Sequence, residues 1–164
     1  MIVLVRVDNR LLHGQVLETW IPRLGVGTVV VADDEAARSP LAHAAMTLCV
    51  PPELDTRILP LAEVDFAGLA AASVRVLVLV RDVAGLVGAA AHGLTPAHAP
   101  RLNLGNIHFS EGRRPVSPSV FLTEAELAAL GTLVSAGFEV EARAIPQDAP
   151  IGLAELGRRY AAGA

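Results

Sequence analysis

Short apolar runs alternate along the chain with segments whose apolar positions follow a helical spacing. The apolar runs are rich in valine and leucine and predict buried strands at residues 2–7, 28–32, 56–59, 74–80, 101–104 and 138–145. Helices are predicted at residues 15–21, 40–49, 62–72, 83–91, 124–136 and 153–161. Because buried parallel strands are continuously apolar and are joined by helices, this pattern predicts an α/β fold, with three layers α/β/α and a mostly parallel, open, twisted sheet.

Local signals sharpen several of these boundaries. Thr123 and Glu126 form a capping box at the start of one helix, and Asp82 can cap another. Pro22 is expected to stop or kink the first helix, because proline removes a backbone donor. Residues 105–118 are polar and contain glycine, so we expect a loop there.

Composition limits the class of protein. A chain of 164 residues with 52% hydrophobic residues predicts a single domain, residues 1–164, with an ample core. No apolar run approaches the roughly 18 to 20 residues of a membrane span, and the N-terminus lacks a signal-peptide pattern, so we expect a soluble, cytoplasmic protein that does not itself span the membrane. The single Cys49 excludes an intrachain disulfide and is expected in the core.

Charge and missing motifs exclude several functions. The net charge of −4 argues against nucleic-acid binding through a basic face. All 13 basic residues are arginine, which excludes a Schiff base and a P-loop lysine. The sequence also has no dinucleotide-binding loop, nucleophile elbow or zinc-protease motif, and no metal site is predicted.

The polar loop after the first predicted strand carries the densest set of reactive side chains. Arg6 and Asp8 alternate with apolar residues at the strand end, so they lean to the same side, and Arg10 follows on the loop. His13 comes immediately before a predicted helix, where free backbone N–H groups favour an anion. Neighbouring guanidinium groups disfavour a protonated imidazole and favour a bound phosphate, which suits a nucleophile for phosphoryl transfer. The same spacing also fits a surface ion-pair cluster beside a histidine that merely begins a helix.

Other polar loops admit two interpretations each. The acidic run at residues 33–35 can be a metal or acid–base cluster, but a solvated loop is favoured. Arg81 follows a strand and is a candidate phosphate contact. Asn103, Asn106 and His108 surround a glycine, where turn formation explains them as well as ligand contact does.

A resemblance separates the two interpretations of the first loop. The run Arg-Val-Asp-Asn-Arg-Leu-Leu-His-Gly-Gln-Val at residues 6–16 resembles the active-site loop of the IIB subunits of mannose-family sugar phosphotransferase systems (PTS), usually Arg-Ile-Asp-Asp-Arg-Leu-Ile-His-Gly-Gln-Val. Residues 29–35, 103–109 and 112–114, the capped helix and the last strand also resemble that family.

The resemblance implies a function and a set of roles. His13 would accept a phosphoryl group from a IIA phosphohistidine protein and pass it to a sugar entering through the membrane permease subunits IIC and IID, without a metal or organic cofactor. Arg6 and Arg10 would support the phosphate, with Asp8 as their partner. The other implied or candidate phosphate contacts are Gly14, Gln15, Arg81, Asn106 and His108. Arg6, Arg10 and Arg81 would also give the rim of the sheet that carries the His13 loop a positive charge, which would attract an acidic partner protein.

The sequence departs from the family pattern at three places. Asn9 replaces the second acidic residue, Pro22 interrupts the first helix, and Arg81 with Asp82 replaces smaller polar residues. A regulatory phosphocarrier of the same family that lacks a working permease fits the sequence equally well. A non-catalytic small-molecule-binding α/β module fits less well, because it would leave the His13 loop without a purpose.

Overall fold

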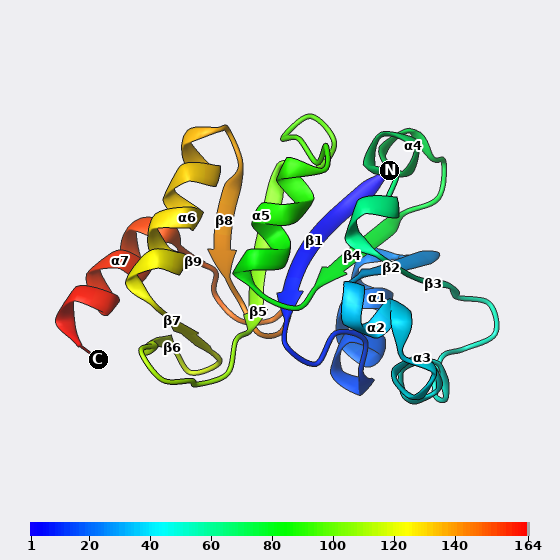
Figure 1. The fold of residues 1–164 in the computed structure, drawn as a ribbon, viewed down its shortest axis with the longest axis horizontal. Helices are drawn as coiled ribbons and strands as arrows, with labels where there is room; N and C mark the ends of the chain where they lie inside the picture. The colour runs from blue at the N-terminus through cyan, green and yellow to red at the C-terminus, as the bar shows by residue number, and fades with distance from the viewer. Residues whose placement is uncertain (164) are drawn as a thin grey trace.

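Strands and helices alternate along most of the chain, as the apolar pattern predicts. The computed structural model describes residues 1–163 (Figure 1). Its strands are β1 (Ile2–Asp8), β2 (Thr28–Ala32), β3 (Asp55–Leu59), β4 (Val76–Val80), β5 (Arg101–Asn106), β6 (Arg114–Ser117), β7 (Val120–Leu122), β8 (Glu139–Ala142) and β9 (Ile151–Gly152). Its helices are the π-helix η1 (Val16–Trp20), α1 (Ile21–Leu24), α2 (Asp34–Arg38), α3 (Pro40–Thr47), the 3₁₀ turn η2 (Leu61–Glu63), α4 (Phe66–Ala71), α5 (Val83–Ala91), α6 (Glu124–Ser135) and α7 (Leu153–Ala162).

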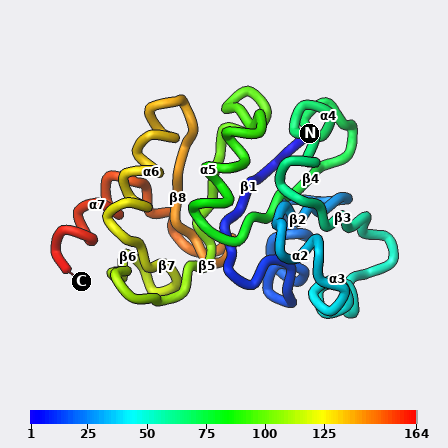
Figure 2. The backbone as a smooth tube through the Cα atoms, in the orientation of Figure 1, coloured from blue at the N-terminus to red at the C-terminus, as the bar shows by residue number. Residues whose placement is uncertain are grey.

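Seven of the strands form one sheet in the order β3-β2-β4-β1-β5-β8-β9. All neighbouring pairs are parallel except β8 with β9. The strands β6 and β7 form a separate antiparallel hairpin. Figure 2 shows the path of the chain, with the segment that follows β1 at the lower edge of the sheet, where the parallel strands end. The predicted three-layer α/β architecture is confirmed.

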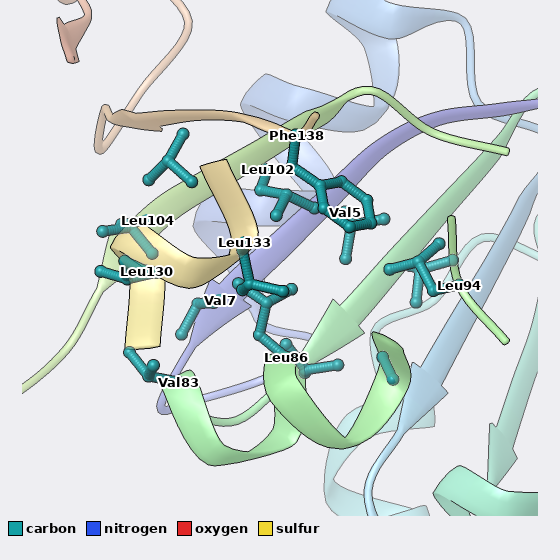
Figure 3. Close-up of a cluster of buried hydrophobic side chains, with 14 of the residues drawn as sticks. Val5, Val7, Val83, Leu86, Leu94, Leu102, Leu104, Leu130, Leu133 and Phe138 are labelled. Carbon is teal, nitrogen blue, oxygen red and sulfur yellow. The ribbon is translucent and has the colours of Figure 1, made fainter. Parts of the chain in front are cut away.

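Two apolar cores lie on opposite faces of the sheet, because successive residues of a strand point to opposite sides. Val5 and Val7 of β1 pack with α5, α6 and Phe138 in the larger core, which Figure 3 shows in close-up. Leu4 packs in the other core with Trp20 of η1 and with α2 and α3. In β1, therefore, Arg6 and Asp8 point to the side of the sheet that η1 covers.

The first helix differs from the prediction. Pro22 does not stop it, because the π-helix η1 runs directly into α1 and Pro22 is the second residue of α1. The helix ends at Gly25, which has a left-handed φ of 61°.

Other boundaries also differ. The predicted helix at 62–72 is divided, because Asp65 leaves the helical path and caps α4. The expected loop at 105–118 contains β6, and the last strand is shorter than predicted. Cys49 is exposed instead of buried, since α3 turns Met46 towards the sheet and ends before the cysteine. No helix in residues 1–163 has the length and apolar content to cross a bilayer.

The predicted capping box at α6 is confirmed and supports a stability prediction. Thr123 Oγ1 accepts from the Glu126 backbone N–H at 3.1 Å, and Glu126 accepts in return from the Thr123 N–H at 2.8 Å. Thr123→Ala should lower the free energy of unfolding by about 1 kcal/mol, because the backbone N–H of Glu126 loses its acceptor. The reciprocal hydrogen bond from the Thr123 N–H would also be weakened. Urea unfolding measures this loss. The matched control is Thr132→Ala on the exposed side of the same helix, and an equal loss there would contradict a specific capping effect.

Candidate active site

The loops that follow β1, β4 and β5 meet at one edge of the sheet. In parallel α/β sheets, ligands bind beyond the carboxyl ends of the strands. Asn9 joins the three loops: its Nδ2 donates to the carbonyl of Arg81 at 2.8 Å, its Oδ1 accepts from the backbone N–H of His108, and its own N–H donates to the carbonyl of Asn106. The side chain of His13 is presented on this edge.

A buried ion pair lies beneath the His13 loop. The side chains of Arg6 and Asp8 are both fully buried, and Arg6 Nη2 donates to Asp8 Oδ2 at 2.9 Å. Burial lowers the pKa of Arg6, and the adjacent Asp8 carboxylate partly offsets this effect. Burial alone would raise the pKa of Asp8, but the hydrogen bond with His13 and the charge of Arg6 outweigh it and hold that pKa below its usual range. Both members of the pair are therefore charged.

His13 contacts the carboxylate directly. Its Nε2 lies 3.1 Å from Asp8 Oδ2, the same oxygen that accepts from Arg6, and its side chain is 16% exposed. Within residues 1–163, the ring nitrogen Nδ1 has no hydrogen-bond partner. The expectation that guanidinium groups set the environment of His13 is therefore wrong for Arg6, because the charged group in contact with the imidazole is a carboxylate.

The backbone of the loop fixes the place of His13. Asp8 Oδ1 accepts from the N–H of Arg10 at 3.1 Å, and the Asp8 carbonyl accepts from the N–H of Leu11 at 2.9 Å. Leu11 has a φ of 55°, which is uncommon for a bulky residue and unfavourable in isolation. Burial of Leu11 and Leu12 in the core beside η1 holds the turn in this conformation. The segment immediately before His13 is thus anchored.

Arg10 lies beside His13 and is 47% exposed at its side chain. Its Nη2 donates to Gln15 Oε1 at 3.3 Å. In the orientation of the Asn106 amide that turns its oxygen towards Arg10, that oxygen accepts from Arg10 Nε at 3.2 Å and Nη2 at 3.3 Å. The first helix amides, those of Gly14, Gln15 and Val16, have no acceptor within residues 1–163. A guanidinium group and free amides therefore lie next to His13, an arrangement that favours an anion.

The guanidinium group of Arg81 is paired with Asp33 and is not free to bind an anion at the His13 loop. It donates to both carboxylate oxygens of Asp33, at 2.8 and 2.7 Å, and Asp33 also caps α2 by accepting from the Ala36 N–H. Burial raises the pKa of Asp33, but the hydrogen bond and charge of Arg81 outweigh it and lower that pKa overall. Asp33 in the acidic run thus has a structural role, and the idea that Arg81 contacts a phosphate gains no support.

The expected rim of three cations is also wrong. Arg6 is fully buried and Arg81 is paired with Asp33, so Arg10 is the only one of these three arginines with a largely exposed charge. His108 is exposed and approaches the loop through its backbone, by the contact with Asn9.

Sequence reasoning missed three residues that hold Arg6 in place. Asn103 was considered as a turn former or a ligand contact, yet it is fully buried and accepts from Arg6 Nη1 at 2.6 Å. Trp20 lies with its ring centroid 5.1 Å from Arg6 Cζ, and the Arg143 carbonyl accepts from Arg6 Nη1 at 3.1 Å. The one signal available was that Trp20, the only tryptophan, follows His13 at a helical spacing of two turns.

Comparison with known proteins gives a consistent assignment. The family described as PTS system sorbose subfamily IIB component matches residues 2–161. The N-acetylgalactosamine-specific phosphotransferase enzyme IIB component 2 of Escherichia coli K12 is 30% identical over 156 residues, 94% of this chain and 98% of the relative. The mannose-specific EIIAB component of the same strain is 25% identical over 93% of this chain and 47% of the relative. The crystal structure of manxB from Thermoanaerobacter tengcongensis superposes with a TM-score of 0.84 at 26% identity, covering 98% of this chain and 96% of the other.

The buried pair predicts an acid-dependent stability. Asp8→Asn should lower the free energy of unfolding at pH 7 by about 3–5 kcal/mol, because Arg6 is left buried without a counter-charge. The stabilisation from Asp8 is fully present above its unfolded pKa of about 3.9 and is lost as the pH falls through its lower folded pKa. The difference in the free energy of unfolding between the wild type and Asp8→Asn should therefore become smaller in acid.

Urea unfolding of both proteins between pH 7 and pH 3 measures that gap. The control is Asp55→Asn, which removes a half-exposed carboxylate paired with Arg57 and should change stability far less. A gap at pH 3 as large as at pH 7 would contradict an ionised Asp8 in the folded protein.

Proposed function

The chain belongs to the sorbose subfamily of PTS IIB components, and on that premise we propose that His13 carries the phosphoryl group. As a IIB component, the protein is a sugar phosphotransferase that takes the phosphoryl group from IIA and delivers it to the sugar. We assign this activity to a single IIB domain comprising the whole chain. Its partners in this proposal are a IIA phosphohistidine protein and the membrane subunits IIC and IID, and it works in the cytoplasm.

One observation supports His13 above all others: Asp8 Oδ2 lies 3.1 Å from Nε2. A carboxylate oxygen accepts a hydrogen bond from an N–H at that nitrogen, so the neutral ring is held with hydrogen on Nε2 and a lone pair on Nδ1. Nδ1 is then the nucleophile. Its lone pair attacks the phosphorus of the IIA phosphohistidine, a bond forms between Nδ1 and phosphorus, and the bond from phosphorus to the IIA nitrogen breaks.

Asp8 also suits the charge that develops in this step. As Nδ1 bonds to phosphorus, the imidazole that keeps its Nε2 proton becomes positive, and the adjacent carboxylate stabilises that charge. The positive ring is in turn a good leaving group. When a sugar hydroxyl attacks the phosphorus, the bond from phosphorus to Nδ1 breaks, the ring leaves as neutral imidazole and the hydroxyl proton passes to water. One side chain thus assists both the acceptance and the release of the phosphoryl group.

The surroundings of His13 suit the phosphoryl oxygens. Phosphoryl transfer depends mainly on positioning and on stabilisation of charge. Arg10, steadied by Gln15 and Asn106, supplies a partly exposed guanidinium group, and the free amides at the start of the helix supply further donors. We propose that these groups hold the phosphoryl oxygens. Arg6 supports the site indirectly through Asp8, since its own side chain is fully buried.

Phosphorylation should occur once per chain, on Nδ1 of His13. Incubation with phosphoenolpyruvate, enzyme I, HPr and a cognate IIA, followed by intact-protein mass measurement, should show the added group, and phosphorus–nitrogen NMR couplings identify the nitrogen. The bond should be stable in base and labile in acid, as expected of a phosphoramidate. His13→Gln should abolish labelling, whereas His108→Gln should retain it. Labelled His13→Gln protein would overturn the assignment.

Arg10→Ala should slow phosphorylation roughly tenfold or more, because one charge-assisted hydrogen bond of about 1.5–3 kcal/mol to the phosphoryl group is lost. The fold should be unaffected, since this side chain is about half exposed. Rapid-quench measurement at saturating phosphorylated IIA gives the rate constant. Arg38→Ala, which removes an exposed arginine on α2, serves as control and should leave the rate unchanged. A normal rate for Arg10→Ala would show that Arg10 does not act on the phosphate.

A further inference from the structure

The position of the buried Arg6 guanidinium depends on few contacts. Nη2 donates to Asp8, and Nη1 donates to Asn103 Oδ1 and to the carbonyl of Arg143. Nε has no partner within residues 1–163, so these three hydrogen bonds alone fix the guanidinium in its own plane. Asn103 also donates from Nδ2 to the same Arg143 carbonyl at 3.1 Å, which in turn fixes the orientation of its amide.

Gly105 determines how close the backbone comes to this group. A Cβ atom at position 105 would lie 1.9 Å from Arg6 Cζ and 2.1 Å from both Nη atoms. Non-bonded atoms cannot approach so closely, and the guanidinium cannot move away freely because it is hydrogen-bonded at its edge and packed near the ring of Trp20. Any side chain at position 105 must therefore displace Arg6.

A bulge explains why the backbone approaches Arg6 here. Val7 pairs with Leu104, but Asp8 pairs with Asn106, so Gly105 is an extra residue in β5 opposite the end of β1. Glycine in a strand often marks a bulge or a close backbone approach. The bulge thus occurs where β1 turns into the His13 loop.

We propose that Gly105 and Asn103 are positioning residues for phosphoryl transfer, acting on His13 through Arg6 and Asp8. The coupling is short, because a single oxygen, Asp8 Oδ2, accepts from Arg6 Nη2 at 2.9 Å and lies 3.1 Å from His13 Nε2. Displacing the guanidinium pulls this oxygen away from the imidazole. The ring then loses the part of its preference for the Nε2–H form that the carboxylate supplies, and the Nδ1–H form, which has no lone pair on Nδ1 for the attack, becomes more populated. This inference rests on the proposed role of His13.

The test compares Gly105→Ala with Gly131→Ala. The same methyl group at position 131, in α6, meets no atom within 4 Å. Nitrogen NMR of the unphosphorylated proteins reports which ring nitrogen of His13 carries the proton. Wild type and Gly131→Ala should show the Nε2–H form, and Gly105→Ala should show a mixture of both forms. A purely structural role of Gly105 would leave the ring of the folded protein unchanged.

Kinetics provide the second measurement. At saturating phosphorylated IIA, Gly105→Ala should be slower than wild type by roughly 10- to 100-fold, as expected for a misplaced reacting group, with an unchanged half-saturating IIA concentration. Asn103→Ser, which removes the amide acceptor without adding volume, should change both readouts in the same direction and covers the case in which Gly105→Ala does not fold.

The outcomes separate this inference from the proposed function. An unchanged His13 ring and an unchanged rate in a folded Gly105→Ala or Asn103→Ser protein would overturn the inference while leaving phosphorylation of His13 in place. The ring measurement uses no phosphoryl donor. A shift of the ring in these variants, with a wild-type protein that is never phosphorylated on His13, would support the coupling and overturn the function.

Discussion

The ion pair between Arg6 and Asp8 is the constraint on which the site depends. Removing a guanidinium group from water is strongly unfavourable unless its donors are satisfied and its charge is matched. Asp8 supplies the charge, and Asn103 and the Arg143 carbonyl supply acceptors from β5 and from the end of β8. The pair is therefore satisfied only when these strands are assembled beside β1. The site therefore requires the same order of strands as the fold.

The structure separates the two charges that the loop motif places close together in sequence. Arg6 is fully buried and contacts the carboxylate, whereas Arg10 is 47% exposed and, in the proposed function, binds the phosphoryl group. This division suits a carrier that must release its group again. In the proposed function, the fixed buried charges set the tautomer of the imidazole, and the exposed guanidinium of Arg10 supplies a charge for the phosphoryl oxygens.

The sequence was sufficient for features that depend on neighbouring residues. The strand at residues 28–32 and the capping box at Thr123 follow from local pattern and are present as predicted. The role of His13 follows from the motif and stays a prediction. The burial of Arg6 and the pairing of Arg81 with Asp33 were not predictable in this way. Both depend on the order and register of strands far apart in sequence, which alternation of apolar residues does not encode. The bulge at Gly105 also depends on strand register and was not predictable from the local pattern.

Asn9 shows how a departure from the family pattern can be accommodated by the fold. An amide can donate and accept at once, and Asn9 does both, donating to the Arg81 carbonyl and accepting from the N–H of His108. An ionised aspartate at this position could accept but not donate, so the contact with the loop after β4 would be lost. That loop is held independently by the pair of Arg81 with Asp33. Asn9 therefore holds the backbone of this loop beside the His13 loop, and the Arg81 side chain holds the same loop to Asp33 after β2.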